Sequence, residues 1–459
     1  MAVTIVYGHP GGVEPQFADR PLLSTPEGGF VATDAALVEL WRAAAGRSFD
    51  DLVATAPVHP DLDGITDAAL ACLAEAGLLS RTPAASRPDP PLRPLKVGAT
   101  VSAVIVISGP GELVWLEECI RALSLQHHPL HTILIVDNLV GVDMAGWLSE
   151  RGLKAEVHRL TAKSSFSAAL NAGRAAATGV DFLLLMNADI RAHPSCVRNL
   201  VARAEETPRC AAVAPKLYLW RTPAFLNGLG NRVPGWGYGT DNGMGQLDLG
   251  QFEGWTDVPS GCLAALLVSV RAFDDIGGLD QRYPLYYEDT DWSYRARLLG
   301  YRIAAAPDAH GLHAFAATST GAEPAALSAA KLEKAVFGQI RFALKVGSPG
   351  RTALLVLHAS IDARTNFVGA IQSRNWKIAA AYARAAAKTA WSLPALFVTR
   401  WRVQSRRAVR DAELFAGADD LTPSMVWRNA PKLTCANVRN YYAPLMRGGK
   451  TRSLPELAG

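Results

Sequence analysis

The chain of 459 residues lacks the features that mark several common classes of protein. Its six cysteines are scattered, with no C-x-x-C pair and no cysteine–histidine spacing of a zinc site, so we expect small buried thiols in a reducing compartment. No apolar run approaches the roughly 18 residues of a membrane span, and the first residues do not read as a signal peptide. We therefore expect a cytoplasmic protein, with peripheral contact at the inner face of the cell membrane left open.

Two common phosphate-binding motifs are also missing. There is no G-x-G-x-x-G after the first strand of the strand–helix region described below, and no G-x-x-x-x-G-K-[ST] anywhere. The usual dinucleotide-binding loop and the P-loop are therefore excluded. A phosphorylated ligand would need another device to balance its charge.

The composition is that of a folded protein, with 49% hydrophobic and 19% charged residues, and the net charge is +4. That charge is unevenly distributed. Residues 1–96 hold 7 Lys/Arg and 12 Asp/Glu, whereas residues 351–459 hold 17 and 6. Only the C-terminal segment is strongly basic.

The chain divides into three segments by pattern. Residues 1–95 contain two helix-like stretches, 34–45 and 66–76, and predict a small helical or winged-helix-like module. A linker follows, because residues 82–94 contain five prolines. We expect a second domain at 96–349 and a basic helical region at 350–459.

The second segment alternates apolar strand patterns with helical ones. Such alternation is typical of βαβ units and predicts an α/β domain with a mainly parallel sheet. The strands are expected at 101–107, 132–136, 155–160 and 182–186, and the helices at 113–125, 165–177 and 194–206.

Two acidic clusters lie about a hundred residues apart. Asn187-Ala188-Asp189 follows a continuous apolar run, which predicts a strand buried on both faces and puts Asp189 at the sheet's carboxyl edge, where such folds bind ligands. Residues 288–291, Glu-Asp-Thr-Asp, open a helix-like stretch that ends at Gly300. Each cluster has a structural alternative, a strand-ending turn or a helix cap, but together they predict one active site.

Residues 227–245 contain seven glycines together with Trp236 and Tyr238. We interpret this stretch as an active-site lid that carries aromatic side chains, because it lies between the two acidic clusters. The alternative is a flexible surface connection.

The basic segment carries apolar and aromatic residues beside clustered arginines. This pattern favours an interfacial helix on anionic lipid, and the alternative is a helical hairpin packed on the main domain with a solvated basic face. We do not expect nucleic-acid binding, since the arginines are not interleaved with a recognisable binding fold. The arginines are Arg400, Arg402, Arg406, Arg407 and Arg410.

Several segments follow one another in the order found in a known family. They are the strand at 101–108, residues 135–138, the helix at 166–173, residues 187–189, residues 259–280, residues 288–292 and His313. Through this ordered series residues 101–320 resemble family 2 glycosyltransferases of the GT-A fold, especially the bacterial rhamnosyltransferase-like branch. The resemblance implies a mainly parallel sheet flanked by helices.

The resemblance also implies roles for single residues. The general base is Asp289, with Glu288 and Asp291 as neighbours that orient it or raise its pKa. Asp189 is the metal ligand, with His313 as a second ligand and His310 as its rival. The nucleotide-binding residues are Ser108, Asp137, Asn138, Asn171 and Asn187, and the acceptor-side residues are Trp236, Gly261 and Trp292.

A family member of this kind moves a sugar from a nucleotide sugar, here a UDP- or dTDP-sugar, to a hydroxyl of a lipid-linked or cell-envelope glycan. It inverts the anomeric centre and uses Mg²⁺ or Mn²⁺ as a Lewis acid. Altered residues around Ser108 and Asp137 motivate a second reading, a non-catalytic glycan- or nucleotide-binding partner. Nucleotidyl transfer is a third. The sequence leaves open whether the chain forms a homo-oligomer.

Overall fold

The computed structural model describes residues 5–8, 15–17, 21–24, 30–32, 41–47, 79–83, 90–220, 222–233, 239–244, 252–314 and 329–415. Its centre is a nine-stranded sheet with the order β10-β16-β11-β15-β9-β6-β7-β8, and β12 pairs with β11. Six of these strands run in one direction, and β10, β12 and β15 run in the other. The strands are β6 (Val101–Ile107), β7 (Thr132–Asp137), β8 (Glu156–Arg159), β9 (Phe182–Met186), β10 (Ile190–Ala192), β11 (Cys210–Leu219), β12 (Thr222–Leu229), β15 (Ala265–Ser269) and β16 (Arg302–His313).

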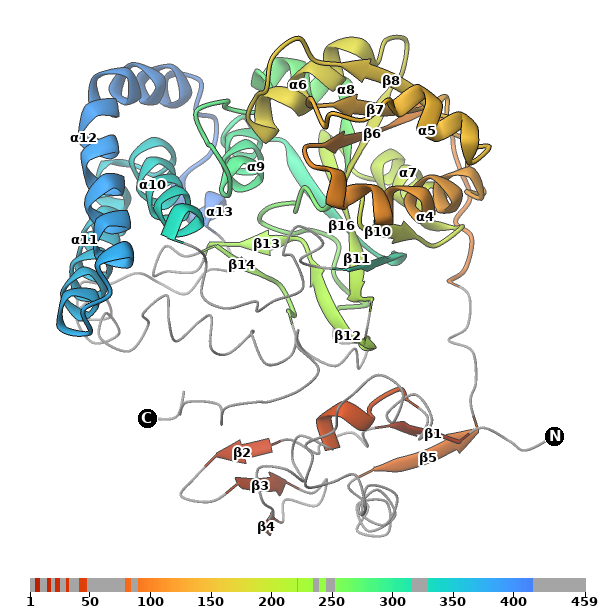
Figure 1. Ribbon diagram of the computed structural model, residues 1–459, viewed down its shortest axis with the longest axis horizontal. Helices are drawn as coiled ribbons and strands as arrows, with labels where there is room; N and C mark the ends of the chain where they lie inside the picture. Colours follow the sequence, from red (N-terminus) through yellow and green to blue (C-terminus); the bar gives the residue numbers. More distant parts are fainter. Residues whose placement is uncertain are drawn as a thin grey trace.

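Helices cover both faces of this sheet (Figure 1). Alternate side chains of a strand point to opposite faces, so in β6 Ala103 and Ile105 join one buried cluster, whereas Val104 and Val106 join the other. The first cluster includes residues of α4 (Leu113–Ser124), α5 (Met144–Glu150) and α7 (Cys196–Glu206). The second includes residues of α6 (Phe166–Ala176), α8 (Val270–Ile276) and α9 (Glu288–Leu298).

The predicted α/β fold is confirmed, and so are its four strands and three helices to within a few residues. The predicted strand at 182–186 is β9, which lies between β6 and β15 with Leu183, Leu184, Leu185 and Met186 buried. We did not predict α5 or the strands from β10 onward. These strands form the half of the sheet where order along the chain and order in the sheet differ most.

The described parts of the first segment contain short strands that the helical prediction did not include. They form one two-stranded and one three-stranded sheet. Residues 41–44 are helical, within the predicted helix at 34–45, whereas the predicted helix at 66–76 lies outside the described residues. The strands are β1 (Ile5–Gly8), β2 (Pro15–Phe17), β3 (Pro21–Ser24), β4 (Phe30–Ala32) and β5 (Ser80–Pro83).

The end of the proline-rich linker is attached to α7. Arg93 pairs with Glu206 and Asp308, and the backbone N–H groups of residues 96–98 donate to the Glu205 carboxylate. These hydrogen bonds lower the pKa of Glu205. The domain boundary near residue 95 stays a prediction, with its last residues held against the α/β domain.

The C-terminal region is helical, as predicted, and begins before residue 350. It consists of α10 (Ala329–Val346), α11 (Pro349–Gln372), α12 (Trp376–Ser405) and α13 (Asp411–Leu414). In α10, Phe342 packs against Tyr294 of α9 with ring centroids 5.1 Å apart. None of the described helices combines the length and apolar character that crossing a bilayer requires.

Candidate active site

The two acidic clusters meet at the start of β15. The Leu263 N–H donates to Oδ2 of Asp289 at 3.3 Å, and the next residue, Ala264, accepts the Asn187 N–H through its carbonyl at 2.9 Å. The end of β9 and the first turn of α9 are therefore joined by two consecutive residues. The prediction that these distant segments form one site is consistent with this geometry.

The predicted metal ligands lie side by side. Antiparallel pairing of β10 with β16 puts Ile190 opposite His313, and Nε2 of His313 lies 3.4 Å from Oδ1 of Asp189. The other ring nitrogen, Nδ1, lies 2.8 Å from Oδ1 of Asn227, an amide oxygen that can only accept. In the tautomer with the proton on Nδ1, His313 donates to Asn227, and Nε2 is the basic nitrogen that faces Asp189, as metal ligation requires.

These two side chains fit a divalent ion that takes its other ligands from elsewhere. No group of three or more His, Cys, Asp or Glu side chains arranged for a metal occurs within the described residues. Mg²⁺ and Mn²⁺ prefer oxygen ligands and keep several waters or substrate oxygens, so one carboxylate and one imidazole suffice beside a diphosphate. The rival ligand His310 is engaged elsewhere, because its Nε2 lies 2.7 Å from the Pro307 carbonyl.

A buried carboxylate marks the predicted nucleotide side. Asp137 ends β7 and is 1% exposed; its Oδ1 accepts the Val140 N–H at 2.9 Å, while the buried Oδ2 has no hydrogen-bond partner among the described residues. Nε of Arg159 lies 3.6 Å from Oδ2. A buried acceptor without a donor is costly, so Oδ2 suits a donor group of a ligand.

Asn138 joins three loops at the same edge of the sheet. Its amide nitrogen donates to Oγ of Ser108 at 3.1 Å and to the Ser164 carbonyl, and its amide oxygen accepts the Ser164 N–H. These bonds occupy the Asn138 amide, so Asn138 positions the loops after β6 and before α6. Ser108 lies in the first of these loops.

Two charged residues near this edge were missed by the sequence reasoning. The Lys163 ammonium donates to the Ser108 carbonyl, and the Ser108 N–H donates to Glu112 at 3.1 Å. Burial raises the pKa of Glu112, the hydrogen bond from the Ser108 N–H opposes this rise, and the negative charge of Asp189 adds to it. Lys163 supplies positive charge that no local motif indicated.

A strained turn introduces the second cluster. Tyr286 and Tyr287 both have φ of 68°, a conformation that bulky side chains rarely adopt, and α9 begins at the next residue. Helix α10 packs closely against this turn at Gly338, because a Cβ there would lie only 3.1 Å from the Tyr286 carbonyl oxygen. The chain thus turns sharply and places Glu288 and Asp289 in the first turn of α9.

Asp289 is surrounded by neutral hydrogen-bond donors. Besides Leu263, its Oδ2 accepts from Nδ2 of Asn231 at 3.3 Å, and its Oδ1 accepts from the N–H of Thr290 at 2.7 Å. Burial raises the pKa of Asp289, and these hydrogen bonds oppose the rise. Burial and then the Asp289 charge raise the pKa of the neighbouring Glu288 to about 8. A carboxylate with a raised pKa is suited to accept a proton.

The described part of the predicted lid is a β-hairpin at this cluster. Asn231 in β13 (Asn231–Arg232) pairs with Asp241 in β14 (Thr240–Asp241). Burial and then the negative charge of Asp289 raise the pKa of Asp241 to about 7. Asp241 is therefore a third acidic neighbour, and nothing in its sequence context distinguished it. Trp236, predicted to face the acceptor, lies outside the described residues.

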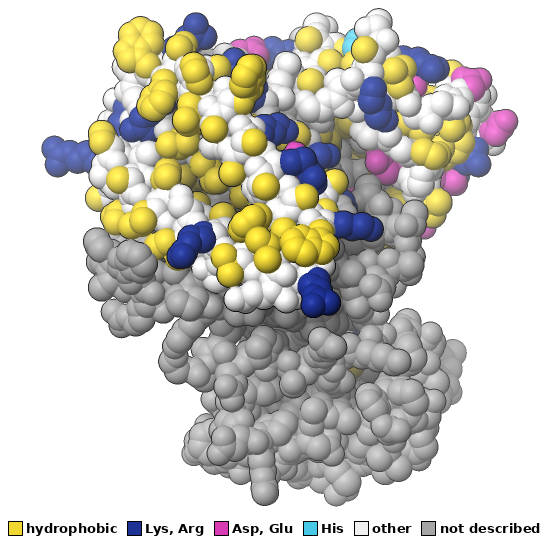
Figure 2. All heavy atoms as spheres, turned by 60° about the vertical axis from the view of Figure 1, so that its left-hand side comes forward, with side chains coloured by type: hydrophobic (Ala, Val, Ile, Leu, Met, Phe, Trp, Pro, Cys, Tyr) yellow, Lys and Arg dark blue, Asp and Glu magenta, His cyan; other side chains and the backbone are white. Residues whose placement is uncertain are grey.

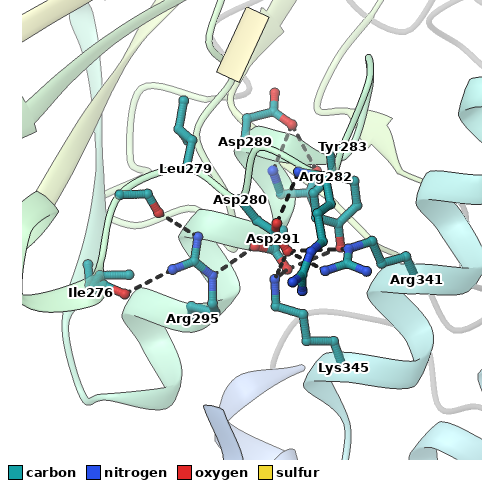
Figure 3. Close-up of polar contacts among 12 residues, drawn as sticks. Ile276, Leu279, Asp280, Arg282, Tyr283, Asp289, Asp291, Arg295, Arg341 and Lys345 are labelled. Carbon is teal, nitrogen blue, oxygen red and sulfur yellow. Dashed lines mark hydrogen bonds and ion pairs between the residues drawn. The ribbon is translucent and has the colours of Figure 1, made fainter. Parts of the chain in front are cut away.

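Asp291 faces a different environment from Asp289 (Figure 3). It is 0% exposed; its Oδ1 lies 2.6 Å from Nζ of Lys345 in α10, and its Oδ2 accepts from Arg295 at 2.8 Å. Asp280 also binds Lys345, at 2.9 Å, and Arg341, at 2.7 Å. Asp291 thus joins α9 to α10, and its role as a neighbour that orients Asp289 or raises its pKa stays a prediction.

The middle of the chain is similar in sequence to known proteins. Residues 105–276 match the family model for glycosyl transferase family 2. This match confirms the resemblance predicted from the sequence. The N-acetylglucosaminyl-diphospho-decaprenol L-rhamnosyltransferase of two Mycobacterium tuberculosis strains is 32% identical over 167 residues, which cover 33% of this chain. The aligned residues span about half of that relative, 52%.

Solved structures of glycosyltransferases are similar at low identity. One is GalNAc-T7 with UDP, GalNAc and Mn²⁺, 12% identical over 57% of this chain and 51% of that one, with a TM-score of 0.45. Another is the mannosyltransferase PcManGT from Pyrobaculum calidifontis with GDP-Man and Mn²⁺, 15% identical over 65% of this chain and 91% of that one, with a TM-score of 0.38.

Three residues predicted to contact substrates make packing contacts or hydrogen bonds inside the α/β domain. Trp292 is 1% exposed and packs against Phe273, and its acceptor-side role stays a prediction. Gly261 allows close packing, because a Cβ there would lie 2.3 Å from Leu266. Asn171 exchanges two hydrogen bonds with the backbone of Leu279, so it fixes α6 to the loop before α9.

Proposed function

We propose that this protein is a metal-dependent, inverting glycosyltransferase that uses a nucleotide-sugar donor. The proposed acceptor is a hydroxyl of a lipid-linked or cell-envelope glycan. The family match supports the reaction class, and the name of the curated relative, which denotes transfer to a decaprenol-linked sugar, supports the acceptor class. Because that relative is matched over half its length, the acceptor belongs to the proposal.

The donor is proposed to lie along the carboxyl edge of β6, β7 and β9. Oδ2 of Asp137 accepts a hydrogen bond from the nucleotide, and Lys163 provides positive charge for the diphosphate. Asp189 and Nε2 of His313 are the ligands for Mg²⁺ or Mn²⁺, which when bound stabilises negative charge on the leaving diphosphate. Asn187, with its backbone fixed to Ala264, is placed to contact the donor beside Asp189.

Asp289 is proposed as the general base. It removes the proton from the acceptor hydroxyl while that oxygen attacks the anomeric carbon, and the nucleoside diphosphate leaves from the opposite face with the bonding electrons. A single displacement of this kind inverts the anomeric centre. Leu263 and Asn231 hold the Asp289 carboxylate in one orientation.

One observation carries the proposal: the residue pair Leu263–Ala264 touches both a carboxylate placed as a base and the segment that ends in the metal-binding carboxylate. A transferase needs both functions beside one sugar carbon. A turn and a helix cap with unrelated structural roles would not need to share these two residues.

The test is thermal stabilisation by UDP, dTDP and GDP, each with and without Mn²⁺, because a ligand that favours the folded state raises the unfolding midpoint. We expect a shift with one nucleotide that requires the metal and is lost in Asp189→Ala. The control is Asp257→Ala, which removes an exposed carboxylate paired with Arg302 at the other end of β16.

The same preparation is then assayed for sugar transfer with the donor that carries the identified base. Turnover with inversion supports the proposal. Nucleotide binding without turnover over a panel of donors and acceptors would favour the non-catalytic binding protein. No binding of any nucleotide would contradict the transferase and leave the glycan-binding partner as the reading to pursue.

A further inference from the structure

The C-terminal helix α12 exposes large apolar side chains at one place. Trp391 is 90% exposed, Phe397 62%, Val398 50% and Trp401 71%, and all four lie within seven residues of Pro394, which stands inside the helix. We call these four residues the aromatic corner. Folded chains rarely leave such side chains in water together, so the cluster indicates a surface that binds something.

The charge of α12 narrows the choice of partner. The helix contains Lys377, Arg384, Lys388, Arg400 and Arg402 and no acidic residue. Figure 2 shows hydrophobic side chains over the C-terminal helices with Lys and Arg between them. Tryptophan is enriched at membrane–water interfaces, and basic residues beside it are attracted to anionic headgroups.

Several arginines of the predicted basic cluster are engaged within the protein, so other cations are available for a partner. Arg400 donates to the Leu344 carbonyl, Arg406 pairs with Asp275, and Arg407 pairs with Asp411. These three members of the predicted arginine cluster hold the C-terminal helices in place. Lys388 and Arg402 are exposed on either side of the aromatic corner and remain accessible to a partner.

We propose that the aromatic corner docks on the surface of an anionic lipid bilayer, with Trp391 and Trp401 entering the headgroup region. Two other occupants fit less well in charge. Residues 416–459 carry 6 Lys/Arg and 3 Asp/Glu, so that tail has the same sign as the corner. A second copy presenting the same basic face would repel the first.

Thr399, which lies between members of the corner, contacts the segment that leads to the candidate base. Arg282, between Asp280 and Tyr283, donates through Nη1 to Oγ1 of Thr399 at 2.9 Å. Thr399 directly follows Val398 of the corner. Docking there would bring the loop before α9 close to the bilayer, where a lipid-linked acceptor lies. The docking itself does not depend on any chemistry at Asp289.

The experiment is co-sedimentation of the full chain with phosphatidylcholine vesicles, with and without phosphatidylglycerol. We expect binding that requires phosphatidylglycerol, weakens with salt and falls by about tenfold or more in the double variant Trp391→Ser/Trp401→Ser. The matched control is Trp376→Ser, which removes a tryptophan that is 64% exposed at the far end of the same helix and should leave binding unchanged. Circular dichroism checks that each variant is folded.

Three results would overturn the proposal. They are no sedimentation of the wild type with anionic vesicles, equal binding by the double variant, and an equal loss in Trp376→Ser. Lipid-free light scattering separates the remaining case: a dimer that the double variant dissociates would assign the corner to a contact between copies. Nucleotide binding should be the same in the double variant and the wild type, so a failure here is distinct from a failure of the proposed transferase.

Discussion

Carboxylates on the two sides of the first turn of α9 lie in opposite electrostatic environments (Figure 3). On one side Asp289 is buried among neutral donors, Oε2 of the buried Glu288 has no hydrogen-bond partner among the described residues, and burial raises the pKa of both carboxyls. On the other side Asp280 and Asp291 meet Arg295, Lys345 and Arg341. Although burial opposes it, the charges of Lys345 and Arg341 hold the pKa of Asp280 well below its usual range.

This difference indicates which carboxylates have a structural role and which are suited to chemistry. A buried carboxylate paired with cations is stabilised in its charged form, and removing its partner costs several kcal/mol, so it holds elements together. A buried carboxylate held only by neutral donors binds a proton more readily and is suited to chemistry. Asp280 and Asp291 therefore fasten α10 to α9, and Asp289 is the carboxylate that we propose as the general base.

The largest expected effect is on the reactive side. Asp289→Asn keeps the shape of the side chain but removes the base, so we expect a fall of about 10²- to 10⁴-fold in kcat, with an unfolding midpoint close to that of the wild type. Steady-state assays under conditions where chemistry limits the rate measure it. Asp257→Asn, an exposed acid, is the control. Unchanged kcat in Asp289→Asn would remove the proposed base.

On the paired side we expect a loss of stability. Lys345→Met leaves Asp280 and Asp291 with one cationic partner fewer in a buried setting, which should lower the free energy of unfolding by about 3–5 kcal/mol. Urea unfolding measures the change.

Adding Asp291→Asn should recover part of this loss, because the two residues are coupled through the ion pair. Lys154→Met, at an exposed lysine, should change stability by no more than about 0.5 kcal/mol. An equally small effect of Lys345→Met would show that the network does not hold α10 to α9.

The smallest expected effect is the pH dependence of stability. It should have opposite signs for the carboxylates with a raised pKa and for those paired with cations. The folded chain keeps the Glu288 proton up to about pH 8, whereas the unfolded chain releases it near its ordinary value of 4.5. The folded state binds more protons between these values, so the free energy of unfolding should fall as the pH rises from about 5 to 8, by on the order of 3 kcal/mol. Asp241 acts in the same direction.

Glu288→Gln should flatten that slope, and unfolding curves at several pH values provide the measurement. The paired side has the opposite sign: because the pKa of Asp280 is lowered, its contribution is lost as the pH falls below about 4, near its ordinary value of 3.8. An identical slope in Glu288→Gln and wild type would show that Glu288 does not carry this dependence.

Local patterns were sufficient where a residue's environment is set by its neighbours in the chain. The apolar run before Asp189 predicted a buried strand, and β9 is that strand. Ser165 caps α6 by accepting the Ala168 N–H, in agreement with the predicted helix. The same reasoning missed β10 to β16, since Ile190–Ala192 is too short to show a period and its partner strand lies more than a hundred residues along the chain.

The roles of single polar residues were harder to predict. Asp289 and Asp291 stand two positions apart in one acidic motif. Asp291 differs in having two cationic partners, Arg295 four residues later on the same helix and Lys345 from α10, and only the second is distant in the chain. Asn227 and Asp241 come from a glycine-rich stretch that we interpreted as a lid, with no pattern to mark either as part of the site. Lys163 lies in an ordinary loop and reaches Ser108 only because α6 follows β8 back to the sheet edge.

The sequence by itself determined the α/β architecture, the resemblance to family 2 glycosyltransferases and the positions of the acidic clusters, because hydrophobic periodicity and motif order are local properties. The tertiary structure alone decided which carboxylate meets cations and which meets neutral donors. That choice depends on burial and on partners brought by elements distant in the chain, and in a low-dielectric interior a single nearby cation changes the protonation of an acid.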